Sequence, residues 1–265
     1  MQKGSDKMVE LLDKFFESSL LPMTPIPSYG WFHILYTLIG FIVCGFTAWK
    51  MRNISEKAAR WFIFGIGLFL SLTEVYKQLF LYFNSENHTY NWGELPFQLC
   101  SVPMYLCLIA PWLKPGKLQR GMYSFMVLFN LLGGGISFLE PSGLLLDDWF
   151  STVHALFWHM SLVFLGLFLC FSKRGATEKA DYKGAAFTFV GLCAVAFAIN
   201  VFVQNVLGKH INMFFVGPGE SPIIVFKQFC QWFGWPVNTF IYIFALCLGA
   251  YLIHLLIQLI MKKKA

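Results

Sequence analysis

The sequence predicts an all-α protein, a polytopic membrane bundle of about seven transmembrane helices with an N-terminal helix at the membrane interface. Three observations support this fold class. The 265-residue chain is 57% hydrophobic but only 13% charged, with a mean hydropathy of +0.60, whereas an ordinary soluble domain carries about 25% charged residues. Apolar segments long enough to cross a bilayer recur along the chain. Lys and Arg gather in alternate connections between these segments.

Two regions are predicted, residues 1–30 and residues 31–265. Within the first, residues 8–21 mix apolar and charged side chains in the pattern of an amphipathic helix lying in the membrane interface. The stretch contains no continuous apolar core, so we do not expect a signal peptide there. The second region is predicted to be a single transmembrane domain.

A membrane-crossing helix needs about 20 predominantly apolar residues. Seven segments reach or nearly reach this length, at residues 31–51, 60–83, 94–113, 121–139, 149–172, 184–206 and 236–261. The connection 207–235 is unusually rich in Phe and Trp, which favours an interfacial or re-entrant segment at the outer mouth of the bundle. A loop that merely packs on the bundle explains this composition equally well.

The loop charges predict the orientation of the chain. The connections after the first, third and fifth spans are basic, and the C-terminal tail ends in three lysines, whereas the two intervening connections contain almost no Lys or Arg. Because basic loops stay in the cytoplasm, the N-terminus is expected outside and the C-terminus inside. The basic residues are Lys50, Arg52, Lys57, Arg60, Lys114, Lys117, Arg120, Lys173, Arg174, Lys179, Lys183, Lys262, Lys263 and Lys264.

Polar side chains of the spans gather in the half of the bundle expected to lie near the outer surface. Because polar groups are costly in hydrocarbon, each needs a partner or a task. They either line a pocket for a lipid head group or small solute, or hold helices together; Glu74 and Lys77, one turn apart, also suit a simple ion pair. The candidate substrate-binding residues are Glu74, Lys77, Glu94, Gln98, Asn130, Asn200, Gln204 and Asn212.

The third span begins with ELPFQLCSVP at 94–103, which places Cys100 among polar residues. A thiolate attacks carbonyl carbon, and an imidazole raises the thiolate fraction. His154 and His159 in the fifth span are the candidate partners. They lie about 140° apart around a helix, so they hardly face one point, and depth counted from the helix starts mildly favours His154. The other six cysteines are expected to be buried hydrophobic residues without a disulfide framework or a metal site.

Five stretches match one known family: LPFQLCS at 95–101, FLEPSG at 138–143, FWHMSLVFLGLFL at 157–169, INMFF at 211–215 and GWP at 234–236. In these the sequence resembles the bacterial YwaF-like integral membrane proteins, whose eukaryotic relatives are the transmembrane protein 164 family. The eukaryotic members move a fatty acyl chain between glycerophospholipids through a Cys nucleophile and a His. The family often has a His just before the Leu-Cys pair, where this chain has Gln98.

The resemblance implies that Cys100 is the nucleophile, that His159 rather than His154 is the base, and that the protein lies in a bacterial plasma membrane. A thiol-dependent phospholipid acyltransferase is therefore the first functional hypothesis. A non-catalytic lipid or solute binder or transporter is the second, and an accessory membrane subunit is the third. We expect membrane lipids as partners, and no nucleic acid, cofactor or metal.

Overall fold

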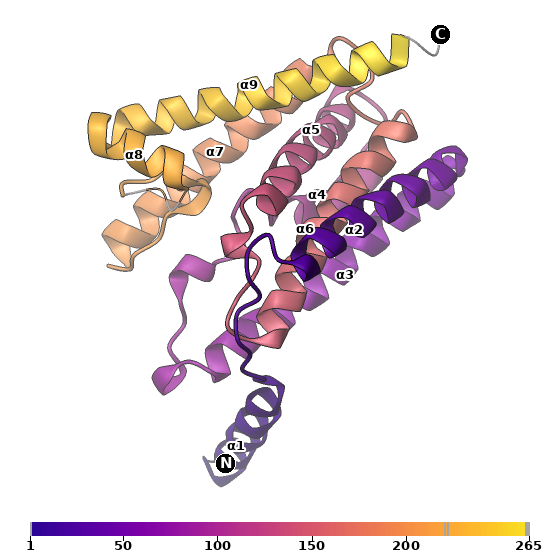
Figure 1. Cartoon of the computed structure of the whole chain (residues 1–265). Helices are drawn as coiled ribbons and strands as arrows, with labels where there is room; N and C mark the ends of the chain where they lie inside the picture. The colour runs from indigo at the N-terminus through magenta and orange to yellow at the C-terminus, as the bar shows by residue number, and fades with distance from the viewer. Residues whose placement is uncertain (1, 220, 222, 263–265) are drawn as a thin grey trace.

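A computed structural model of the chain describes residues 2–219, 221 and 223–262 and confirms the all-α fold (Figure 1). Six of the helices in this part of the chain, α2, α3, α5, α6, α7 and α9, are long and apolar enough to cross a membrane. The helices are α1 (Gln2–Ser19), α2 (Trp31–Lys50), α3 (Glu56–Phe83), α4 (Val102–Ile109), α5 (Lys117–Leu139), α6 (Trp149–Phe171), α7 (Asp181–Val206), α8 (Ile224–Phe233) and α9 (Trp235–Lys262).

The third predicted span differs from the expectation, because 94–113 is not one continuous helix. Regular helix begins only at Val102 and continues as a 3-10 turn to Trp112. The residue before a proline is disfavoured in the α conformation, which keeps Leu95 extended ahead of Pro96. Pro103 then stands in the first turn of α4, where its missing N–H costs nothing. The span is therefore an irregular segment, 95–101, followed by a short helix.

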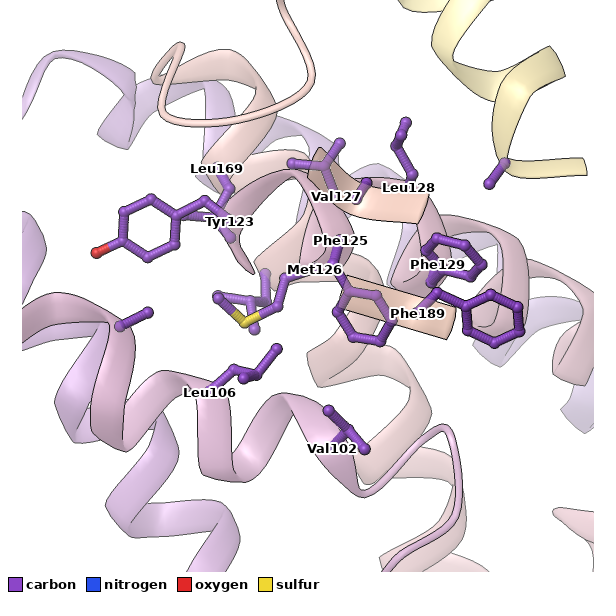
Figure 2. Packing of buried hydrophobic residues seen from close by; sticks show 14 of the residues in the cluster. Val102, Leu106, Tyr123, Phe125, Met126, Val127, Leu128, Phe129, Leu169 and Phe189 are labelled. Carbon is purple, nitrogen blue, oxygen red and sulfur yellow. The ribbon is translucent and has the colours of Figure 1, made fainter. Parts of the chain in front are cut away.

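Helix α5 is the centre of the bundle, with α4, α6 and α7 around it (Figure 1). Its Met126 points toward Leu106 of α4, while Phe129 lies beside Phe189 of α7 (Figure 2), with the two ring centroids 4.5 Å apart. Gly134 brings α5 close to α6, because a Cβ there would lie 2.8 Å from the Val163 side chain. This tight centre fixes the relative positions of the helices that carry the candidate site.

The basic connections meet at one end of the bundle, as an odd number of crossings requires. Arg174 donates to Glu56 at 2.9 Å across the loops that follow α2 and α6. Arg120 binds both carboxylate oxygens of Asp181, which joins the loops before α5 and α7. The protein is thus a multi-pass membrane protein in which α4 and its irregular leader complete the third crossing. Lys263 and Lys264 of the basic tail lie outside the described residues.

Helix α1 lies at the opposite end from the basic loops (Figure 1). It begins earlier than the expected 8–21 helix, and it exposes Met8, Leu11 and Phe15. Among residues 7–19 only Phe16 is buried, and its ring stacks on Phe83 of α3 with centroids 5.2 Å apart. The helix predicted within residues 8–21 is therefore present, and its place in the membrane interface stays a prediction. The division of the chain at residue 30 stays a prediction.

The connection 207–235 has two parts with different surroundings. Residues 211–217 lie inside the bundle, and Ile211, Met213 and Phe214 are fully buried. Helix α8 then runs along the outside, with Val225 and Trp232 exposed. The segment is therefore a buried loop followed by an amphipathic surface helix.

Candidate functional site

The buried loop 211–217 is held by side-chain amides. Asn200 of α7 donates to the carbonyl of Met213 at 3.0 Å and accepts from its N–H at 2.6 Å. Gln204, one turn later, donates to the carbonyl of Ile211 at 2.6 Å. Buried backbone groups without such partners would each cost about 1–3 kcal/mol. We call this set of side-chain amides, Asn200 and Gln204 together with Gln98 and Asn212, the amide clip.

Gln98 ties the irregular segment 95–101 to the same loop. Its Oε1 accepts from the N–H of Phe214 at 2.9 Å, and its Nε2 donates to the carbonyl of Asn212 at 3.3 Å. The Asn212 side chain accepts from Gly217 N–H at 2.9 Å, although its Nδ2 is buried without a partner. The loop needs this support because Phe214 and Phe215 both adopt positive φ, near 55°. The amide clip therefore fixes backbone.

A second polar group surrounds the start of the broken span. Lys77 Nζ lies 3.1 Å from Glu74 and 3.4 Å from Glu94, so the expected pair on α3 extends to a third side chain. Gln78 donates to Glu74 at 2.7 Å and to the backbone carbonyl of Glu94 at 2.6 Å. Burial, with the two carboxylates nearby, raises the pKa of Tyr90 in the adjoining loop. These contacts anchor the start of 95–101 on α3.

Cys100 lies where the broken span meets α3 and α6. It is partly buried beside Leu70 of α3 and Trp158 of α6. The Trp158 Nε1–H donates to the Cys100 carbonyl at 3.0 Å. The Tyr105 hydroxyl, from α4, donates to the Pro96 carbonyl of the irregular segment at 2.8 Å. Irregular backbone at membrane depth is tolerated only where protein satisfies its polar groups. Cys100 is thus a thiol on a fixed, non-helical backbone inside the membrane bundle.

His154 lies between Cys100 and the lipid-facing surface of the bundle. Its ring is 5.3 Å from Trp158 and 5.8 Å from Phe150, centroid to centroid. It lines a groove of about 410 Å³ between α3 and α6 whose other walls are almost entirely apolar. Its Nε2 is buried and has no hydrogen-bond partner among the described residues. The imidazole therefore presents an unused polar atom to an apolar groove.

His159 faces the interior of the bundle. On α6, Trp158 and Leu162 pack toward Cys100, whereas Val163 packs on α5; at 100° per residue, His159 falls between these two directions. Its Nδ1 lies 2.8 Å from the Ala155 carbonyl. A carbonyl only accepts, so in the neutral ring this contact places the proton on Nδ1 and leaves Nε2 as the base. The preference for His154 on depth stays a prediction.

Asn130 of α5 is 3% exposed, and its Nδ2 is unpartnered within the part of the chain that is described. It stands one turn from Met126, whose sulfur is 3.8 Å from that of Cys107 on α4, so this face of α5 looks toward the broken span. All seven cysteines are free. Of the six expected to be buried, Cys230 and Cys247 are only partly buried.

Sequence reasoning missed two features of the site. Nothing in the sequence pattern shows that the indole of Trp158 would bind the Cys100 carbonyl. The hydrogen bonds between the amide side chains and 211–217 could not be predicted from the sequence either. The loop turns at Phe214 and Phe215, which adopt positive φ, whereas Gly or Asn is usual at such positions.

Comparison with known families supports the resemblance drawn from the motifs. A model of the TMEM164 family matches residues 28–254, which include the broken span, both histidines and the buried loop. The chain belongs to the TMEM164 family. No curated protein and no solved structure gives a significant match. Within this TMEM164 family member, the match begins just before α2 and so leaves out α1.

Proposed function

We propose that this protein transfers acyl chains between membrane glycerophospholipids through a thioester on Cys100. The observation that supports this most is the break in the third span, which holds one partly buried thiol on fixed irregular backbone beside a histidine-bearing helix. Burial disfavours a free thiolate, so attack needs a base that takes the proton as the bond forms. His159, with Nε2 left basic by its Nδ1 contact, suits that role.

The transfer consists of two balanced steps. In the first, Cys100 Sγ attacks the ester carbonyl carbon of a donor phospholipid while His159 Nε2 takes the thiol proton. The S–C bond forms, the C–O bond to glycerol breaks, and the leaving oxygen takes the proton to give a lysolipid. In the second, a hydroxyl of an acceptor lysolipid attacks the thioester, its proton passes to Nε2, the C–S bond breaks and the thiol is restored.

The remaining residues divide between substrate and scaffold. Asn130, with its unpartnered Nδ2, is assigned to the acyl carbonyl, and the Glu74, Lys77 and Glu94 group to the head-group side. Gln98, Asn200, Gln204 and Asn212 are assigned to holding the site in shape, since they bind backbone. We place Cys100 in the outer half of a bacterial plasma membrane, with α1 outside, because the basic loops occupy the opposite end.

The test compares Cys100→Ala with Cys247→Ala, a matched removal of a partly buried thiol on α9. Each protein is reconstituted in phosphatidylcholine vesicles with an isotope-labelled lysophospholipid acceptor, and acylated acceptor is measured by mass spectrometry. We expect wild-type rates for Cys247→Ala and none above protein-free vesicles for Cys100→Ala. Equal transfer by both variants would refute the thioester route.

A lipid-binding protein without catalysis is the second candidate, favoured by the apolar groove at His154. It predicts that phospholipid binds the wild type and Cys100→Ala alike while no acylated acceptor forms with either. The same reconstitution therefore separates the two functions.

A further inference from the structure

The groove at His154 is the outer part of a longer apolar groove between α3 and α6. A second hollow of about 410 Å³ follows it toward the basic end of the bundle. The two share Phe69 and Phe157, whose ring centroids are 5.5 Å apart, and both of these side chains are about half exposed. We call the two hollows together the α3–α6 groove. It opens sideways, on the surface that the bundle turns to lipid.

The length of this groove matches a hydrocarbon chain. From Tyr76 at its outer end to Trp61 at its inner end, α3 rises about 22 Å at 1.5 Å per residue. One leaflet contributes only about 15 Å of a 30 Å hydrocarbon core. A chain that begins at the level of Tyr76 can therefore stay against protein along its whole length and pass the bilayer midplane.

The polarity of the groove is uneven along its length. The inner part is lined by Phe, Leu, Ile, Trp and Gly, with Ser161, whose hydroxyl is already bonded to the Phe157 carbonyl. The outer part carries His154, whose buried Nε2 lacks a partner among the described residues. A ligand that fits has one polar end and one long apolar tail.

The groove is also adjacent to the proposed nucleophile. Leu70 lines its inner part and Trp158 its outer part, and both side chains also pack beside Cys100. Cys100 therefore packs against the same cluster of side chains that forms part of the groove wall.

We propose that the α3–α6 groove holds one acyl chain of a membrane glycerophospholipid, with the ester end beside His154 and the tail running past Phe69 and Phe157 toward Gly65. This assignment deepens the proposed acyl transfer and rests on it for the identity of the chain as substrate. Neutral His154 donates from Nε2 to an ester carbonyl of the lipid held in the groove, whereas Asn130 is assigned to the carbonyl that Cys100 attacks. The depth available beyond the Phe69–Phe157 pair sets the chain length that fits.

Photo-labelling tests where the chain lies. Protein is reconstituted with two phosphatidylcholines, one with a diazirine near the carbonyl end of an acyl chain and one with a diazirine near its methyl end. We expect the first to label peptides around Thr73 and His154 and the second to label those around Gly65 and Phe164. Labelling of the lipid-exposed α7 and α9 at the same level, or no dependence on diazirine position, would overturn the proposal.

Labelling needs no chemistry, so it separates this proposal from the transfer reaction. Cys100→Ala is expected to show the wild-type labelling pattern although it transfers nothing. Position-dependent labelling without acyl transfer by the wild type would contradict the proposed enzyme activity but support acyl-chain binding in the groove. Acyl transfer together with indiscriminate labelling would support the activity but contradict binding in the groove.

A glycine substitution tests the length of the groove. A Cβ on Gly65 would meet no atom within 4 Å, so Gly65→Leu fits and fills the inner hollow. Gly191→Leu on α7 is the matched control, with the same open space but no part in the groove. We expect lipids co-purified with Gly65→Leu to shift toward shorter chains by at least threefold in the ratio of 14-carbon to 18-carbon species. An unchanged ratio, or an equal shift in Gly191→Leu, would contradict the assignment.

Discussion

The two sides of the broken span differ in how most of their buried polar groups are used, although Asn212 Nδ2 on the α7 side also lacks a partner in the described structure. On the α7 side, the side chains of Gln98, Asn200 and Gln204 all bind the backbone of 211–217. On the α6 side, His154 Nε2 and Asn130 Nδ2 are buried without partners in the described structure. An unpaired buried group costs free energy that a paired one does not. The comparison fits the proposal that the α6 side serves binding and chemistry, while the side chains of the α7 side hold backbone in place.

The largest expected effect is on the α6 side. His159→Asn keeps a donor for the Ala155 carbonyl but removes Nε2, so the general base is lost while the local fold remains. General acid–base catalysis contributes about 10²–10⁴-fold, and we expect acyl transfer to fall by that factor. The rate is measured as acylated lysolipid formed in vesicles.

His154→Asn is the matched control for this prediction, on the same helix but facing the groove. Its transfer rate is expected to fall less than tenfold. A larger loss in His154→Asn than in His159→Asn would exchange the roles of the two histidines.

The next effect is on the α7 side and concerns stability. Asn200→Leu is similar in volume but leaves the N–H and carbonyl of Met213 unpaired in the core. We expect a loss of about 1–3 kcal/mol in unfolding free energy for each group, measured by denaturant unfolding in detergent. The exposed amide Gln228 on α8 supplies the control Gln228→Leu, which is expected to change little. If both variants unfold alike and only transfer is lost in Asn200→Leu, the amide acts on substrate.

Trp158→Phe sharpens the comparison at the junction of the two sides. It keeps the ring packing but removes the hydrogen bond to the Cys100 carbonyl. One such bond contributes about 0.5–1.5 kcal/mol, so we expect up to about a tenfold lower turnover with lysolipid KM unchanged. Trp149→Phe, an exposed indole at the start of α6, is the control. A rise in KM without a change in turnover would show that Trp158 binds lipid instead of positioning the thiol.

The smallest effect is expected at α1. Asp13 Oδ1 lies 2.8 Å from His88 Nε2, on the side of the bundle where Phe16 reaches Tyr76 at the outer end of the groove. Partly exposed pairs of this kind contribute less than about 1 kcal/mol. Asp13→Asn should raise hydrogen exchange in α1, whereas Glu10→Gln, which breaks an exposed pair within the helix, should not. Equal exchange in the two variants would show that the Asp13–His88 contact does not hold α1 beside the outer end of the groove.

Much of the fold could be predicted because it depends on segment length and polarity. The six long helices begin and end within a few residues of the predicted spans, since apolar length and loop charge specify them. The third span could not be resolved, because composition does not show where Pro96 and Pro103 interrupt a helix. Orientation alone predicts that Cys100 and the histidines share the outer half of the bundle, with His154 nearer the level of Cys100. Their partners could not be predicted, since contacts such as Trp158 with Cys100 join residues 58 positions apart.

The central proposal is that the Cys100 thiol, which packs against α6, carries the acyl group as a thioester during transfer. It is tested most directly by incubating the protein with phosphatidylcholine vesicles that lack lysolipid, quenching in acid, and measuring the mass of the peptide containing Cys100 before and after hydroxylamine. The account predicts an added acyl mass on that peptide that hydroxylamine removes and that no other cysteine peptide carries. Acyl transfer to later-added lysolipid with no such adduct on Cys100 would contradict it.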